Sequence, residues 1–141
     1  MIARSEMFTP LLEADASFEP RWLGFISDYA DEPELPLYIA LGEFAQHLIE
    51  RQQRGDTHGF DAVFDVVERW HTEGDTYVSE AASIGFLESL QNQLGGNERG
   101  NRVSGVRASD FEPYLGPETR HWWEKLYRFW EGDPSALRSD T

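Results

Sequence analysis

The 141 residues carry 26 acidic and 12 basic side chains, a net charge of −14, and no cysteine. A chain with this much negative charge repels nucleic acids and anionic membranes. We therefore expect neither as a partner and favour a basic protein instead. The absence of cysteine excludes disulfides, thiolate zinc sites and a cysteine nucleophile, and it suits a cytoplasmic protein. With 40% hydrophobic and 13% aromatic residues, the charge is expected to lie on a folded, aromatic-rich body.

Three helices are predicted in the first part of the chain, at about residues 4–13, 20–29 and 36–53. The third is the strongest, because its apolar residues recur at helical spacing behind a proline that the first turn tolerates. These residues are Leu37, Leu41, Phe44 and Leu48. Near the start, Pro10 and the charges before it interrupt the apolar run that a signal peptide needs, so export is not expected.

A helical hairpin is predicted between residues 57 and 94. Its first helix, at about residues 57–72, carries one apolar stripe, formed by Phe60, Val63, Phe64, Val67 and Trp70. The turn Glu73-Gly74-Asp75 ends this helix with a glycine and supplies Asp75 as the N-cap of the next one. The second helix, at about residues 76–94, has small residues early in its length, where a neighbouring helix can approach closely.

The last part of the chain predicts a basic loop and an aromatic helix. Residues 95–108 contain four glycines and three arginines without a stable period, and only Val103–Val106 suggests a short extended piece. A helix then begins at Gly116-Pro117 and ends before Gly132. Its rings cannot all face inward, so we expect one row in the core and the other at an interface or loop: Trp122, Leu126 and Phe129, or Trp123, Leu126 and Trp130. We predict a single helical domain over residues 1–134 and a flexible tail at 135–141.

The hairpin from Phe60 to Leu94 resembles one unit of the HEAT or armadillo class of helical repeats. This resemblance implies stacked helical hairpins that act as binding surfaces rather than as enzymes. No second copy is evident, and a true solenoid needs at least about three repeats. The predicted fold is therefore all-α, either a short stack of antiparallel helical hairpins or an irregular helical bundle.

The chain also resembles small acidic bacterial proteins that contain a domain of unknown function. The resemblance lies in the hairpin from Glu73-Gly74-Asp75 to Leu90-Gln91-Asn92 and in the tail from Tyr114-Leu115-Gly116-Pro117 to Trp130. Such proteins are similar in size and charge to the immunity proteins that neutralise the toxins of competing bacteria. The resemblance thus implies a protein-binding role with a toxin domain as the partner.

Histidines offer the candidates for chemistry. Glu43, His47 and Glu50 share one helical face and could share a metal ion, although a solvated polar face is the more common arrangement. His71 could act as a general base, or simply stabilise the end of its helix. Serine elbows and phosphate-binding loops are absent from the sequence. We therefore predict no catalytic site, no metal and no cofactor, and keep a metal-dependent enzyme as a third possibility.

Clustered carboxylates are the strongest functional signal. Between Asp56 and Glu88, eight acidic residues accompany one arginine, so this hairpin carries half of the net charge. Solubility alone can explain a high charge, but clustering favours the capture of a basic protein. We predict a partner-binding site with seven carboxylates: Asp56, Asp61, Asp65, Glu68, Glu73, Asp75 and Glu80. The acidic run from Asp28 to Glu34 could join this surface, and Arg99, Arg102 and Arg107 could fold back and mask it.

Two functions follow from these patterns. The leading hypothesis is a non-enzymatic immunity protein or inhibitor that binds a basic toxin domain. The alternative is a structural or adaptor domain of the helical-repeat type that associates with itself through the aromatic row near the carboxyl end. The first predicts a monomer that binds another protein, and the second a homodimer.

Overall fold

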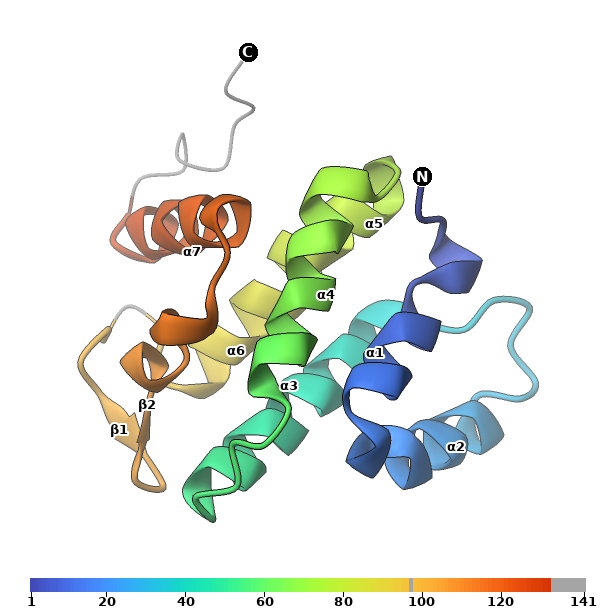
Figure 1. The fold of residues 1–141 in the computed structure, drawn as a ribbon, viewed down its shortest axis with the longest axis horizontal. Helices are drawn as coiled ribbons and strands as arrows, with labels where there is room; N and C mark the ends of the chain where they lie inside the picture. Colours follow the sequence, from blue (N-terminus) through green and yellow to red (C-terminus); the bar gives the residue numbers. More distant parts are fainter. Residues whose placement is uncertain (97, 133–141) are drawn as a thin grey trace.

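A computed structural model of the chain describes residues 1–96 and 98–132 (Figure 1). Within these residues the fold is all-α, as predicted, and the helices form an irregular bundle. The α-helices are α1 (Phe8–Ala14), α2 (Glu19–Asp28), α3 (Leu37–Gln53), α4 (Phe60–Glu73), α5 (Thr76–Glu80), α6 (Glu88–Gln93) and α7 (Pro117–Trp130). The predicted tail at residues 135–141 lies outside the described residues.

One small antiparallel hairpin interrupts the helices. Strands β1 (Arg102–Val103) and β2 (Val106–Arg107) pair Arg102 with Arg107 and Val103 with Val106. The short extended piece expected within the basic loop is therefore confirmed. None of the helices in the described part of the chain combines the length and apolar character needed to cross a membrane.

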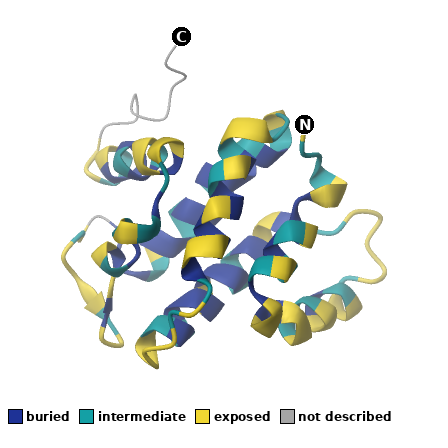
Figure 2. Ribbon diagram, viewed as in Figure 1, coloured by how far each residue is buried: buried dark blue, intermediate teal, exposed yellow. Residues whose placement is uncertain are grey.

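Helix α4 lies at the centre of the bundle, with α1 on one side and α7 on the other (Figure 1). Its predicted apolar stripe is confirmed, because Phe60, Val63, Phe64, Val67 and Trp70 are all fully buried (Figure 2). The indole nitrogen of Trp70 donates a hydrogen bond to the carbonyl of Met7 at 3.1 Å, which ties the centre of the bundle to the start of α1. The opposite side of α4 remains exposed to solvent.

The second helix of the predicted hairpin is divided. Asp75 caps it as predicted, since its carboxylate accepts a hydrogen bond from the amide of Val78 at 2.9 Å. Between α5 and α6, however, Ala81–Leu87 form a π-helical segment that local periodicity did not reveal. Gly85 lies there against α3, where an added Cβ would come within 2.8 Å of Leu41 Cδ1. The small residue thus permits the close helix approach that the sequence indicated.

The first residues of the chain pair with the turn between α4 and α5. The amide of Ile2 donates to the carbonyl of Glu73 at 2.7 Å, and the amide of Asp75 donates to the carbonyl of Ile2 at 2.9 Å. Together they form a parallel bridge between Ile2 and Gly74. The amino terminus is thereby fixed beside the tip of the helical hairpin.

The aromatic helix α7 buries a different row from either that was expected. Trp123, Leu126 and Tyr127 are at most 2% exposed, whereas Trp122 and Trp130 are only partly buried. Tyr127 thus takes the place in the core that the second predicted row gave to Trp130. Among the described residues, the large hydrophobic side chains exposed to solvent lie elsewhere: Met1, Leu23, Tyr38 and Ile39. Helix α7 therefore does not present the exposed aromatic row that the sequence suggested.

Candidate functional site

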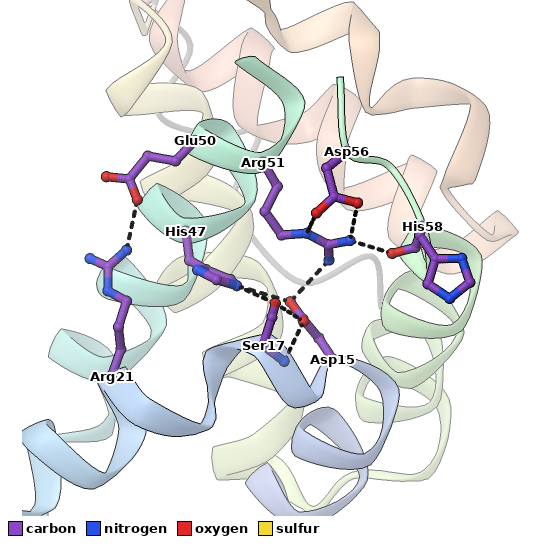
Figure 3. Close-up of polar contacts among 8 residues, drawn as sticks. All are labelled: Asp15, Ser17, Arg21, His47, Glu50, Arg51, Asp56 and His58. Carbon is purple, nitrogen blue, oxygen red and sulfur yellow. Dashed lines mark hydrogen bonds and ion pairs between the residues drawn. The ribbon is translucent and has the colours of Figure 1, made fainter. Parts of the chain in front are cut away.

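Asp56, the first of the seven predicted partner-binding residues, is bound within the fold (Figure 3). Its two carboxylate oxygens accept hydrogen bonds from Arg51 Nε and Nη2 at 3.1 and 3.0 Å. These bonds lower the pKa of Asp56 below its ordinary value. Arg51 also donates to the carbonyl of His58, so this contact closes the loop between α3 and α4. Asp56 is therefore a structural residue in this fold.

Glu68 caps the start of α7 from the side of α4. Its carboxylate accepts hydrogen bonds from the amide of Thr119 at 2.8 Å, the hydroxyl of Thr119 at 2.7 Å and the amide of Glu118 at 3.1 Å. Burial alone would raise the pKa of Glu68, but the hydrogen bonds outweigh it and the pKa is lowered. Gly116 allows this approach, because a Cβ there would lie 2.6 Å from the carboxylate. Glu68 thus supplies the cap that α7 itself lacks.

His71 lies beside this cap and is held neutral. Its Nδ1 is 3.1 Å from the carbonyl of Val67 and 3.2 Å from the hydroxyl of Thr119. Burial lowers the pKa of His71 to about 4, although the nearby charge of Glu68 acts in the opposite direction. The expectation of a cationic histidine that stabilises the helix end is therefore wrong, because desolvation of the ring outweighs the favourable charges.

The other predicted carboxylates do not form one surface. Asp75 is occupied as the cap of α5, whereas Asp61, Asp65, Glu73 and Glu80 are exposed, and no hydrogen bond or ion pair joins their carboxylates to another described residue. Asp61 and Asp65 lie about one turn apart on α4, and both are exposed. Burial raises the pKa of Tyr38 on α3, and the charge of Glu80 adds to this shift. The free carboxylates are therefore fewer than predicted and divided between different parts of the surface.

The basic loop does not cover the acidic hairpin. Arg99 donates to the carboxylates of Glu124 and Glu112, at 2.7 and 3.2 Å, and its guanidinium lies 4.4 Å from the ring centre of Tyr127. It thus fastens the loop to α7 and to the turn before it. The side chains of Arg102 and Arg107 are exposed on the β-hairpin. The idea that these arginines mask the hairpin is wrong for Arg99, which binds Glu112 and Glu124 instead, and no described contact joins Arg102 or Arg107 to the carboxylates of the hairpin.

A buried polar cluster joins the turn between α1 and α2 to helix α3 (Figure 3). Asp15 Oδ2 lies 3.2 Å from Arg51 Nη1 and 3.3 Å from His47 Nε2. The hydroxyl of Ser17 donates to Asp15 Oδ1 and lies 2.9 Å from the same His47 nitrogen. Burial alone would raise the pKa of Asp15, but these hydrogen bonds and the charge of Arg51 lower it to about 2. The cluster therefore holds an ionised carboxylate inside the bundle.

This cluster has the residue types of a catalytic triad without its geometry. In a triad the aspartate and the serine lie at opposite ring nitrogens of the histidine, so that the ring carries a proton between them. Here Asp15 and Ser17 both lie at Nε2 of His47, and Asp15 binds Ser17 directly. Such an arrangement does not activate the hydroxyl. The cluster acts as a structural tie between chain segments.

The structure also changes the interpretation of the Glu43, His47 and Glu50 face. His47 is only 8% exposed, so the predicted solvated position is wrong, since the ring turns towards Asp15. Glu50 pairs with Arg21 at 3.0 Å. Over residues 1–96 and 98–132, no three side chains of His, Asp or Glu are grouped so that they could hold a metal ion. The sequence feature that could have indicated this cluster is Asp15-x-Ser17, a spacing typical of a turn. In it the carboxylate of Asp15 accepts a hydrogen bond from the amide of Ser17 at 3.1 Å.

The chain is an all-α helical bundle, and it matches the family described as a domain of unknown function (DUF7674) over residues 8–131. It therefore belongs to that family. The match extends from the first residue of α1 to just beyond the end of α7, so it covers the helices described above. No curated protein and no solved structure matches the chain.

Proposed function

We propose that this protein is a non-catalytic binding protein whose partner is a basic protein. The observation that carries the proposal is that Asp61, Asp65, Glu73 and Glu80 are exposed and unpaired with other described side chains, in a chain of net charge −14. Carboxylates that the fold does not use remain available to lysine and arginine side chains of another molecule. Such charges steer a basic partner and speed its association.

The partner class that we propose is a basic toxin domain. In this proposal the protein acts in the bacterial cytoplasm as an immunity protein or inhibitor that neutralises the toxin. Many toxin domains that act on nucleic acids must carry positive charge in order to bind phosphates, and an acidic protein competes for the same groups. In this proposal Asp61 and Asp65 lie at the first point of encounter, because both are exposed on the central helix α4. Glu68, Asp56 and Asp75 are left out, because each is already bound within the fold.

Charge reversal tests this proposal. The partner is first identified by co-purification with the tagged protein from its own cells, and its affinity is then measured at two salt concentrations. We expect Asp61→Lys with Asp65→Lys to weaken binding by about tenfold or more and to reduce its salt dependence. The matched control is Glu13→Lys with Glu98→Lys, which makes the same charge change at exposed positions on α1 and in the loop after α6.

Equal losses from both pairs would show that only net charge matters, and unchanged binding in both would contradict the proposal. The self-associating adaptor is less well supported, because of the two tryptophans expected to hold its dimer, Trp123 is fully buried and Trp130 is partly buried against the core. Sedimentation of the purified protein tests that alternative directly, since a stable dimer insensitive to salt would favour it.

A further inference from the structure

Two exposed apolar side chains lie side by side in sequence at the start of α3. Tyr38 is 39% exposed and Ile39 is 48% exposed. On the neighbouring helix α5, the ring of the partly buried Tyr77 lies 6.0 Å from that of Tyr38. We refer to Tyr38, Ile39 and Tyr77 as the tyrosine patch. Tyr38 and Ile39 are not required for the core, because the buried residues Leu37, Ala40 and Leu41 already form the inward face of this turn of α3.

Carboxylates lie near the tyrosine patch. Burial raises the pKa of Tyr38, and the negative charges of Glu80 and Glu88 raise it further. Glu34 similarly contributes to raising the pKa of Tyr77, after the larger effect of burial. An exposed aromatic and aliphatic centre with a charged rim is the usual composition of a protein interface. The rim contains the cation Arg4 as well as carboxylates, but the carboxylates outnumber it, which favours a cationic partner.

Arg4 shows how a guanidinium is bound at the edge of this patch. Its guanidinium carbon lies 4.5 Å from the ring centre of Tyr77, and Nη2 lies 4.0 Å from a carboxylate oxygen of Glu34. The same nitrogen donates to the carbonyl of Leu35 at 2.5 Å. Cation–π contact and a flanking carboxylate thus act together on one arginine. Tyr38, with Glu80 and Glu88 nearby, offers a similar pair of groups to an arginine from outside.

A cavity of about 260 Å³ adjoins the tyrosine patch at Arg4 and Glu34. Its apolar walls come from α1, α2 and the start of α3, and include Phe8, Leu12 and Trp22. The indole of Trp22 stacks on the ring of Phe8 with the ring centres 4.4 Å apart, which gives the cavity a rigid aromatic wall. The cavity could therefore receive an apolar side chain of the partner beside Arg4.

We propose that the tyrosine patch anchors the partner, and that the partner presents an arginine beside an apolar side chain there. This inference rests on the proposed function and assigns the place and chemistry of the contact. Buried aromatic and arginine groups supply most of the energy of an interface, whereas exposed ion pairs supply little. The carboxylates on α4 therefore steer the partner, and the tyrosine patch holds it. A second copy of this chain fits poorly, since two acidic rims would face each other.

Two synthetic peptides test this inference on the intact protein. One alternates arginine with tryptophan and leucine over seven residues, and the other replaces the apolar residues with glycine. We expect the apolar peptide to bind about tenfold more tightly than its glycine counterpart, as measured by calorimetry. Chemical-shift changes in ¹⁵N spectra should centre on Tyr38, Ile39 and Tyr77.

Ile39→Lys is the decisive variant, and Leu23→Lys is its matched control. Both replace an exposed apolar residue with the same cation, since Leu23 on α2 is 56% exposed. Ile39→Lys should weaken binding of the apolar peptide by about tenfold, and Leu23→Lys by less than about twofold. Urea unfolding of both variants confirms that each remains folded.

The outcomes separate this inference from the proposed function. If Ile39→Lys and Leu23→Lys have equal effects, or if the glycine peptide binds as tightly as the apolar one, the tyrosine patch is not the anchor. Binding of both peptides that weakens with salt and with Asp61→Lys and Asp65→Lys would then still support capture of a basic protein through α4. Failure of both peptides to bind at low salt would overturn both proposals.

Discussion

The buried polar cluster and the outer side of α4 both contain aspartates, but the surroundings of these aspartates are opposite. In the cluster, Asp15 is 4% exposed and is surrounded by His47, Ser17 and Arg51. On α4, Asp61 and Asp65 face solvent without a described partner. A carboxylate that already has cationic partners within the fold stabilises the structure, whereas one without them is available to another molecule. The pairing of acidic groups is thus a better guide to function than their number.

Removal of Arg51 should lower the stability most, because it disrupts the buried polar cluster. Arg51→Met leaves the buried charge of Asp15 without its guanidinium partner, and it also releases Asp56. We expect the free energy of unfolding to fall by about 3–5 kcal/mol, measured with urea. Asp61→Asn, on the exposed side, should change it by less than about 0.5 kcal/mol. Similar free energies of unfolding for the two variants would contradict the distinction between paired, buried carboxylates and free, exposed ones.

Acidification should produce the next largest effect, through His71. The folded pKa of about 4 is below the value of 6.5 in the unfolded chain, so only the unfolded chain gains the proton between these values. Stability is therefore complete above pH 6.5 and declines as the pH falls towards 4. We expect a loss of about 2 kcal/mol between pH 7 and pH 5.

Urea unfolding of wild type and His71→Gln at both pH values measures this loss. The variant should show a smaller difference between the two pH values even if it is less stable overall. An unchanged difference would assign the proton uptake to other groups. Asp15 does not interfere, because its folded pKa of about 2 lies below the value of 3.8 in the unfolded chain, and its contribution is lost only as the pH falls through that lower range.

Loss of the cap on α7 should have a smaller effect. Glu68→Ala removes the acceptor for the amides of Glu118 and Thr119 and should lower the free energy of unfolding by about 1–2 kcal/mol. Asp65→Ala, on the same helix but exposed, is the matched control and should cost less than about 0.5 kcal/mol. Thermal or urea unfolding measures both. Equal costs would show that Glu68 behaves as a surface residue after all.

Local patterns in the sequence predicted most of the secondary structure. The apolar stripe of α4 and the cap at Asp75 were evident because they depend on residues within a few positions of one another. The π-helical segment at Ala81–Leu87 was not evident, and it lies where Gly85 comes close to Leu41 of α3. Contacts between segments that are distant in the sequence cannot be read from the spacing of apolar residues within one helix.

The candidate site was harder to predict than the fold, for a related reason. Glu68 and Asp65 look equivalent in the sequence, because both lie outside the apolar stripe of the same helix. Only the fold brings Thr119 to Glu68, across 51 positions, and leaves Asp65 exposed. His47 and Asp15 likewise meet across the bundle. Sequence shows which groups can carry charge, but tertiary contacts decide which of them remain free.

The pairing of Ile2 with the turn between α4 and α5 has a practical consequence for binding experiments. Because Ile2 is fixed against Glu73 and Asp75, anything fused ahead of Met1 emerges at this turn, close to where Arg4 lies over Tyr77. A purification tag or fluorescent protein in that position would shield the tyrosine patch and strain the bridge. A label on the peptide probe keeps this part of the surface open to a partner.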